Sequence, residues 1–592
     1  MYKYLLVLVL GCVFFSGCGS ASLEFGQLIA DDYEYNLREY PLYATSEGDH
    51  RFNDKLTKVS LVDSARRNAK TKAVLVRIDG INRAALSKGE RVSYDIFKRK
   101  FEDGLQWYEF NAWLMPVTQM GGFYSHFPQM HERVPFKTAG DYENYISRLN
   151  AFSGVVDGYI EIMREGIRRG YVVPKVTMAD IGKSIEAHIV EVPEKSHCYK
   201  PFEKFSKFVG VADRERLSAA GREAISQVVV EAYKRFLRFM VDEYIPACRD
   251  TIAASDLPNG KAYYEFCIRS DTTLDISAKE VHETGLAEVA RIKGEMLEVI
   301  AETGFKGGFE KFRKFLRTDK QFYAKDKKEL LKEVAYALKR VDGELPRLFE
   351  ELPRMPYGIK EVPDFIAHDA PAAYYRRPPG DGTMAGFYYV NTYDLGSRPL
   401  YHVEALAMHE AVPGHHLQIA IGQELKDLPK FRQEAHFTAF TEGWALYAES
   451  LGKELGLYED VYSYFGRLDF EMLRACRLVV DTGIHSFGWS REKAIDFMAS
   501  NTSMSVDDIT TEVDRYIVWP GQALGYKIGE LKIQELRKKC EERLGSDFDI
   551  RKFHSVVLGS GAVPLGVLET NINEWLEEQS LSDLGRALRQ RF

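Results

Sequence analysis

The sequence predicts a mainly α-helical protein with a small β-sheet. Most long segments repeat apolar residues at intervals of three and four, as one buried helix face requires. Strand-like sequence is short and is confined to residues 386–394, which are aromatic and β-branched. The chain has 592 residues, 45% of them hydrophobic, so it contains enough apolar material for a large core.

Two segments carry clear helix start signals. Asp326 with Glu329 forms a pattern like a capping box, and Gly343 follows as a stop signal. Ser277 with Glu280 opens a similar helix. Apolar residues at helical spacing follow each start: Leu330, Val334, Leu338 and Val341 in the first, and Val281, Val289, Ile292 and Met296 in the second. Further amphipathic helices are expected near 140–170, 215–245, 400–425, 434–453, 464–485 and 523–545.

The N-terminus indicates export. An apolar run from Leu5 to Phe15 is too short to span a bilayer, which takes about 20 residues, and it is typical of a secretory signal. "FSGC" at residues 15–18 resembles a lipobox, so Cys18 is the expected lipidation site. The alternative is an ordinary secretory signal. We therefore expect a signal peptide at 1–17, a short linker at 18–24 and one helical domain at 25–592, tethered by lipid to the bacterial cell envelope.

Charge and cysteine content exclude some classes of protein. The formal net charge of -8 is mild, and Lys and Arg form no basic block, which argues against nucleic acid as a partner. The mature chain after Cys18 has no C-x-x-C pair, which argues against a disulfide framework. Its remaining cysteines are Cys198, Cys248, Cys267, Cys476 and Cys540.

The sequence "HEAVPGHH" at residues 409–416 begins like the zinc-peptidase signature H-E-x-x-H, but position 413 is proline. His409 and His415 are six apart, about 240° around an ideal helix, so they would not converge on one ion. Pro413 disrupts the helix, and Gly414 permits a conformation that other residues resist. If two residues loop out as a bulge, His415 moves to the place that the second histidine of H-E-x-x-H occupies, one helical turn after His409.

His409 and His415 are therefore the predicted ligands, and His416 is expected beside them or facing substrate. The alternative is that the helix ends at Val412 and leaves the histidines in a solvated turn. A His-Glu pair alone is weak evidence, because His282-Glu283 repeats it without a second histidine and is expected on a solvated helix face.

A candidate third ligand lies on the next predicted helix. In "FTEGWALYAES", residues 440–450, Glu442 and Glu449 share one face at positions i and i+7, away from the apolar stripe. A carboxylate at this distance after two histidines completes a His-His-Glu zinc site that keeps one position open. Glu442 is the predicted ligand. Glu449 is an alternative ligand or an acceptor for a ligand imidazole, and the expectation without a metal is an exposed helix glutamate.

The strand-like stretch "GFYYVNTYD", residues 386–394, precedes the histidine motif closely. Metal-dependent peptidases bind substrate backbone along an exposed strand edge near the metal. Tyr388 and Asn391 are the candidates in this stretch, either for contacting substrate or for supporting the metal ligands. The alternative from sequence is a buried hairpin strand.

Several of these segments together resemble one known family. "EALAMHEAVPGHHLQ", "TEGWALYAE", "CRLVVDTGIHSFGWSREKAIDFM" and "EVDRYIVWPGQALGYKIGELKI" are similar to the bacterial family called domain of unknown function 885, whose members are predicted zinc metallopeptidases. The likeness extends over nearly the whole mature chain. It implies a helical, gluzincin-like fold with a deep cleft and the metal-site core within residues 386–565. "TEGWA" is also similar to the N-E-G-x-A segment of zinc aminopeptidases, in which the glutamate is the third ligand, and this maps onto Glu442.

The resemblance and the motifs together predict a zinc metallopeptidase that binds one Zn²⁺ and hydrolyses peptides. Glu410 is the expected general base for the attacking water. Tyr526 is the first choice for the oxyanion donor, by analogy with related helical peptidases. Other candidates are Tyr516, Gln522 and His554, and for each the alternative is a satisfied core residue.

Other functions stay open at the level of sequence. Arg474, Arg477 and His485 are expected either to bind a substrate carboxylate or to form an ion pair with Asp481. A non-catalytic binding lipoprotein on an inactive scaffold is one alternative function. A zinc-dependent amidase acting on non-peptide amides is another. The oligomeric state is not indicated.

Overall fold

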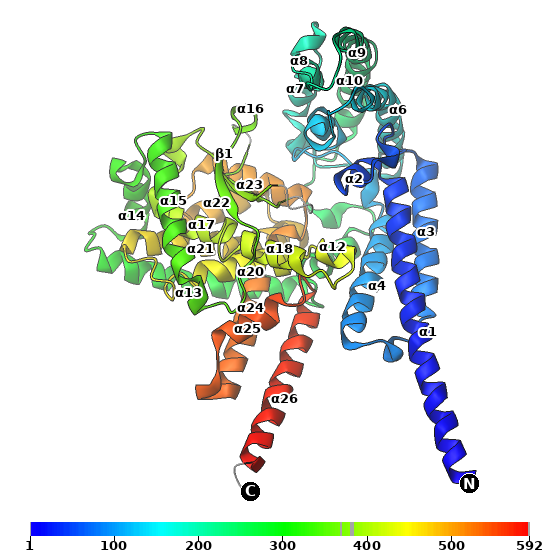
Figure 1. Cartoon of the computed structure of the whole chain (residues 1–592). Coiled ribbons are helices and arrows are strands. Elements are labelled where there is room, and N and C mark those ends of the chain that lie inside the picture. The colour runs from blue at the N-terminus through cyan, green and yellow to red at the C-terminus, as the bar shows by residue number, and fades with distance from the viewer. Residues whose placement is uncertain (1, 368–369, 379–383, 590–592) are drawn as a thin grey trace. The chain divides into compact units, whose positions relative to one another are not determined.

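The computed structural model describes residues 2–367, 370–378 and 384–589, of which 2–18, 365–366 and 582–589 are described by backbone alone (Figure 1). Helices dominate both compact units into which the chain divides. Unit 1 comprises residues 1–252 and 256–260, and unit 2 comprises residues 253–255 and 261–592. From the sequence we expect one helical body from residue 25. Periodicity locates helices, but it does not say which helices share a core.

Unit 1 is a helical body whose core is rich in aromatic rings. Phe152 packs against Phe127 and Tyr233, and all three side chains are buried. Short π-helical turns at Ile225–Val229 and Met240–Tyr244 interrupt the helix expected over 215–245. The helices of unit 1 are α1 (Tyr2–Glu39), α2 (Pro41–Ser46), α3 (Leu61–Asp79), α4 (Lys88–Glu109), α5 (Phe123–His126), α6 (Ala139–Arg169), α7 (Ile181–Glu186), α8 (Lys200–Glu203), α9 (Val211–Ala224), α10 (Val230–Phe239) and α11 (Ile245–Ala247).

The first helix, α1, includes the segment expected as a signal peptide and linker. Residues 18–24 continue the helix, and Ala21 is buried. Phe25 packs against Tyr94 and Phe97 of α4, which fixes this part of α1 to unit 1. The side chain of Cys18 lies outside the described residues. Within the part of the chain that the structure describes, no helix is both long and apolar enough to cross a membrane.

Unit 2 is built around two long helix pairs, α13 with α21 and α20 with α24. In the first pair, Gly285 lies so close to Leu478 and Val479 that a Cβ atom would meet them at 2.7 and 2.8 Å. The helices of unit 2 are α12 (Gly260–Thr272), α13 (Ala278–Glu302), α14 (Gly308–Thr318), α15 (Lys327–Glu344), α16 (Asp364–Ala367), α17 (Val403–Glu410), α18 (His415–Glu424), α19 (Lys430–Gln433), α20 (Thr438–Ser450), α21 (Val461–Phe487), α22 (Arg491–Asn501), α23 (Val506–Val518), α24 (Gly525–Leu544), α25 (Ile550–Leu558) and α26 (Leu565–Arg589).

Glycines set the closest approach in the second pair. A Cβ on Gly443 of α20 would lie 2.5 Å from the Gly529 backbone of α24, and a Cβ on Gly529 would lie 1.8 Å from the carbonyl oxygen of Ala439. The two backbones are therefore in direct contact, which larger side chains would prevent. This contact fixes where α20 lies along α24.

The β-sheet of unit 2 has the strand order β1-β3-β2, with β1 at Tyr357–Glu361, β2 at Ala373–Arg376 and β3 at Gly386–Val390. Strand β3 is parallel to β1 and antiparallel to β2. The strand-like stretch of the sequence is therefore the central strand of the sheet and not an exposed edge. The segments that pair with it were not recognised as strands, because β1 includes a glycine and two charged residues and β2 has only four residues, the last of them charged.

Both predicted helix starts are present. The Asp326 side chain accepts a hydrogen bond from the Glu329 backbone N–H at 2.9 Å, and Ser277 forms a complete capping box with Glu280. Gly343 does not end its helix, which continues to Glu344. Nothing lies within 4 Å of the position where a Gly343 Cβ would stand, and an exposed glycine is tolerated inside a helix at a modest cost.

Candidate metal centre

The histidine motif folds as two helices joined by a tight bend. Helix α17 ends at Glu410 and α18 begins at His415, so the expected single helix with a bulge is instead a complete break. The His416 N–H donates to the carbonyl oxygen of Ala411 across the bend, at 3.0 Å. From the neighbouring helix, Trp444 donates its indole N–H to the carbonyl oxygen of Pro413, at 2.8 Å. The bend is therefore buried and fixed by hydrogen bonds.

Gly414 is required for close packing in this bend. A Cβ at position 414 would lie 2.0 Å from the His409 carbonyl oxygen and 2.3 Å from that of Met408. Its φ is -76°, outside the left-handed region, so close packing is the reason for glycine that the structure displays here. The glycine lets the start of α18 lie directly against the end of α17, and this brings His415 back toward His409.

His409, His415 and Glu442 meet at one point. The Glu442 Oε2 atom lies 3.4 Å from His409 Nε2 and 3.5 Å from His415 Nε2. One ligand atom from each residue lies within 4.8 Å of the other two. A tetrahedral ion with ligands at about 2.0–2.1 Å separates neighbouring ligand atoms by about 3.3 Å. The two measured separations match this value, so the three side chains can hold one metal ion.

Burial and hydrogen bonding support the same assignment. The side chains of His409, His415 and Glu442 are only 4%, 11% and 16% exposed. Glu442 Oε2 is buried and has no hydrogen-bond partner among the described residues. Burial alone would raise the pKa of Glu442, but the two imidazoles hold that pKa well below its usual range. A buried, ionised oxygen without a hydrogen bond, placed between two imidazole nitrogens, is the environment that a cation would satisfy.

Glu449 orients His409 from the opposite side of the ring. Its Oε1 atom lies 2.8 Å from His409 Nδ1, and the carboxylate is 1% exposed. Burial alone would lower the pKa of His409, but Glu442 and Glu449 raise it to about 9. Because the carboxylate accepts a hydrogen bond from Nδ1–H, it turns Nε2 toward the metal position, where a bound ion would replace the Nε2 proton.

Glu410, the predicted general base, ends α17 next to His409. The residue is 8% exposed. Its carboxylate makes no hydrogen bond to any residue in the described part of the chain, so its oxygens are available to a substrate or a water. Burial and the negative charge of Glu410 both raise the pKa of Tyr388, so the tyrosine stays protonated beside it.

Three further predicted residues pack the interior instead of lining the centre. His416 is 1% exposed, and its two ring nitrogens hydrogen bond to Tyr375 Oη and to the carbonyl oxygen of Met355. Burial lowers the pKa of His416 to about 4. Asn391 donates its amide hydrogens to the backbone carbonyls of Ala367, Ala370 and Pro371. Tyr388 is 1% exposed on the central strand. None of these residues is exposed to a substrate in the structure, because each is enclosed by neighbours, and a supporting role is the alternative that burial allows.

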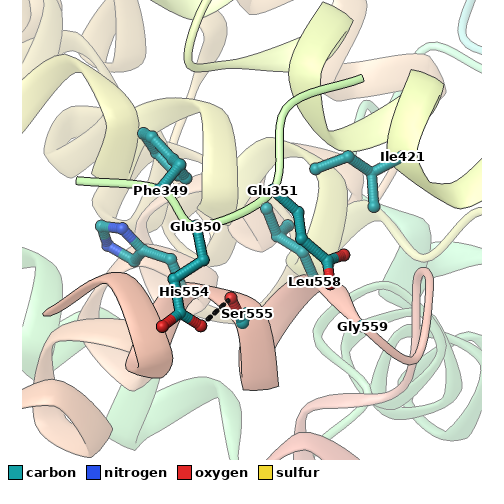
Figure 2. A pocket seen from close by; sticks show the side chains of 8 residues that line it. All are labelled: Phe349, Glu350, Glu351, Ile421, His554, Ser555, Leu558 and Gly559. Atoms are coloured by element: carbon teal, nitrogen blue, oxygen red, sulfur yellow. Dashed lines mark hydrogen bonds between the residues drawn. The ribbon is translucent and has the colours of Figure 1, made fainter. Parts of the chain in front are cut away.

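His554, considered as an oxyanion donor, is a core residue. Its Nδ1 lies 2.8 Å from the Leu348 carbonyl oxygen, and its Nε2 accepts from Tyr447 Oη at 2.9 Å. Phe349 stacks on the ring, as Figure 2 shows at the shallow pocket beside α25. Burial lowers the pKa of His554 to about 3, so the ring is neutral. Because both nitrogens are engaged, His554 has no hydrogen left to donate to a substrate.

Tyr526 belongs to a group of arginines. Its hydroxyl accepts from Arg515 Nη2 at 3.3 Å, and its ring centroid lies 4.4 Å from the Arg477 guanidinium. Tyr516 donates to Glu512 at 2.5 Å and is 1% exposed, so it is a satisfied core tyrosine.

The expected pairing of the arginines with Asp481 is wrong. Asp481 accepts from the Tyr264 hydroxyl and from the Gly521 N–H, whereas Arg477 pairs with Glu512. His485 is also engaged, because it bonds the Ala254 N–H and the Tyr516 carbonyl oxygen.

Two residues near the site were missed in the sequence. His436 is exposed and lies within electrostatic reach of Glu442 and His415. It stands six positions before Glu442, just ahead of α20, and that proximity is the only signal that could have identified it. Arg515 is the other, and it carries no motif of its own.

The comparisons agree with this fold. The family model described as "Bacterial protein of unknown function (DUF885)" matches residues 41–572. The crystal structure of "the putative lipoprotein from Colwellia psychrerythraea" is 30% identical, with a TM-score of 0.89 over 94% of this chain and all of that one. A second "putative lipoprotein of unknown function", from Shewanella oneidensis, is 17% identical with a TM-score of 0.63, over 92% of this chain and 99% of that one. No curated protein matches. The chain therefore belongs to the DUF885 family.

Proposed function

We propose that this protein is a zinc-dependent metallopeptidase that hydrolyses peptides or oligopeptides. The observation that carries the proposal is the convergence of His409, His415 and Glu442 around a buried carboxylate oxygen that has no hydrogen bond. Two neutral imidazoles and one carboxylate form the ligand set of catalytic zinc sites, which keep a further position open for water.

The roles of the side chains follow from their positions. His409, His415 and Glu442 would hold the ion, and zinc in such a site supplies a polarised water and an electrophile for the scissile carbonyl. Glu410 takes the proton of the attacking water and delivers it to the leaving amine, because its carboxylate is free of hydrogen bonds to the described residues. Glu449 keeps the His409 ring in the orientation and tautomer that binding requires.

The proposed location is the bacterial cell envelope, with the chain anchored by lipid at Cys18. Two observations support it. The sequence around Cys18 resembles a lipobox, and both similar solved structures carry the name "putative lipoprotein". A lipid anchor needs no membrane-spanning helix, and it leaves the helical units in the aqueous phase.

The test combines metal content with peptide cleavage. The full mature chain is purified, its zinc is measured by mass spectrometry, and it is incubated with a mixed peptide library whose products are sequenced. Glu410→Gln should keep one zinc per chain and lose cleavage by about 10²–10⁴-fold, the contribution of a general base. Glu442→Gln should lose the zinc itself.

Glu283→Gln is the matched control. Glu283 follows His282 as Glu410 follows His409, but its side chain is 63% exposed and the motif has no second histidine. This variant should keep both zinc and cleavage. Stoichiometric zinc without cleavage of any library peptide would contradict the proposal and would favour a binding role or a non-peptide amide substrate.

A further inference from the structure

Unit 2 contains three arginines that lie beside the metal centre and are incompletely paired. Arg474 and Arg477 come from α21 and Arg515 from α23, and Tyr526 of α24 lies among them. The Arg477 guanidinium lies 4.4 Å from the Tyr526 ring centroid, and that of Arg474 lies 6.0 Å from it. We call Arg474, Arg477 and Arg515 the arginine cluster.

Each arginine of the cluster has an N–H group without a partner. Arg474 Nε, Arg477 Nη1 and Arg515 Nε are buried and make no hydrogen bond within the described chain. Arg474 and Arg477 are 6% and 4% exposed. A buried charged donor without an acceptor is destabilising, and here three such donors lie in one cluster.

The charges of the cluster are also unbalanced. Glu512 is the carboxylate that pairs with Arg477 and Arg515. Burial alone would raise its pKa, but these arginines hold that pKa at about 2, so it contributes one full negative charge. Glu449 lies 3.8 Å from Arg474, but its hydrogen bond goes to His409. Three positive charges therefore face one dedicated carboxylate and one that is shared.

A second buried cluster in the same unit shows that this imbalance is not general. Lys527 is fully buried and lies within 3.0 Å of three carboxylates, and two arginines complete that group. Lys527, Arg291 and Arg467 face Glu288, Glu471 and Glu530, and Arg291 also pairs with Glu295 at its more exposed end. That cluster has a carboxylate for each of its cations, whereas the arginine cluster has more cations than carboxylates, and an acid from outside the chain would balance them.

The cluster is placed to act on a substrate of the metal centre. Arg474 lies 3.8 Å from Glu449, and Glu449 lies 2.8 Å from the predicted ligand His409. Glu449 is therefore the one residue between the cluster and the predicted ligands. The other end of the cluster opens toward solvent, because the Arg515 side chain is 18% exposed. A bound peptide spans about 3.5 Å per residue. A group one or two residues from the cleaved bond would therefore lie a few ångströms from the metal, near enough to reach the cluster.

We propose that the arginine cluster, with Tyr526, binds a carboxylate of the substrate and so selects peptides that present an acid near the cleaved bond. Guanidinium groups bind carboxylates through paired N–H donors, and unpartnered N–H groups are the feature observed. This inference rests on the proposed peptidase function for its substrate class. The carboxylate has two chemical sources, the free C-terminus of a peptide and an acidic side chain.

The experiment measures binding to the metal-free full mature chain, so that no cleavage occurs and no activity is needed. Ligand-observed NMR compares a pool of N-acetylated tripeptides as C-terminal acids with the same pool as C-terminal amides. A third pool of amides carries glutamate as the last residue. The acids should bind about tenfold to a hundredfold more tightly than the plain amides, as expected for a charged hydrogen-bonded pair. Binding by the glutamate amides as tight as that of the acids would assign the carboxylate to a side chain.

Arg515→Gln tests the cluster at its most exposed member, where folding is least at risk, and Arg477→Gln tests its buried centre. Both should abolish the preference for acids. Arg491→Gln is the matched control, because Arg491 is already paired with Asp514 through two hydrogen bonds, and it should keep the preference. Equal binding of acids and amides by the unmodified chain, or an unchanged preference in Arg515→Gln, would overturn the inference.

The two proposals fail in different ways. Absence of zinc or of peptide cleavage, with the preference for acids intact, would refute the peptidase but leave the carboxylate site. Cleavage of amide and acid peptides at equal rates, together with equal binding, would refute the carboxylate site but leave the peptidase.

Discussion

Replacing Gly414 with alanine tests whether the bend makes the metal centre. The new Cβ would lie 2.0 Å from the His409 carbonyl oxygen, and contacts below 3.0 Å are essentially never seen for real Cβ atoms. The start of α18 must therefore retreat by about 1 Å, because the opposing atoms are backbone and cannot rotate away. Metal sites tolerate ligand displacements of only about 0.2 Å. Because His415 moves with α18, we expect zinc affinity to fall by at least about a hundredfold and stability by about 1–3 kcal/mol.

Gly422→Ala is the matched control on the same helix. Nothing lies within 4 Å of its would-be Cβ, and alanine favours the helix over glycine, so this variant should bind zinc normally and be unchanged or slightly more stable. Zinc affinity is measured by competition with a chromophoric chelator, and stability by thermal unfolding. If Gly414→Ala bound zinc as tightly as the unmodified protein, the reasoning from backbone contact would be refuted.

Three further outcomes are expected. Glu449→Gln should weaken zinc binding by about 10–100-fold in the same competition assay, because it removes the carboxylate that orients His409; an unchanged affinity would contradict that role. Burial lowers the pKa of His554 to about 3, so below about pH 6.5 the unfolded chain binds more protons than the folded one, and stability falls as the pH falls. The loss is roughly 2 kcal/mol by pH 5, and thermal unfolding at pH 7 and 5 should show a smaller loss in His554→Gln. Lys527→Met should destabilise the protein by about 3–5 kcal/mol, since it leaves buried carboxylates unpaired; chemical denaturation compares it with Lys538→Met, which changes an exposed side chain and should have no effect.

Local features of the fold could be predicted from the sequence. The Asp326 and Ser277 helix starts are encoded within four residues, and both caps are present. The candidate metal ligands could be predicted for the same reason. His409, His415 and Glu442 lie within 34 positions of one another, on two neighbouring segments with helical periodicity. The form of the bend could not be derived, since it depends on how closely α17 and α18 pack.

Long-range features could not be predicted. His554 is enclosed by Leu348, about 200 positions earlier, and by Tyr447, about 100 positions earlier. Nothing near position 554 indicates either partner, so a candidate donor and a satisfied core histidine look alike in the sequence. The central position of residues 386–390 likewise depends on pairing with β1 and β2, whose sequences carry no clear strand pattern.

One helix controls both sides of the ligand imidazole. Glu442 and Glu449 are seven residues apart on α20, about 10.5 Å along its axis, and the His409 ring lies between them with Nε2 toward the first and Nδ1 toward the second. A slide of α20 along its axis would therefore lengthen one contact while it compressed the other. The axial position of α20 is in turn fixed by Gly443, whose backbone touches Gly529 of α24. The geometry of the metal centre thus depends on a contact between two glycine backbones, one of them adjacent in sequence to the ligand Glu442.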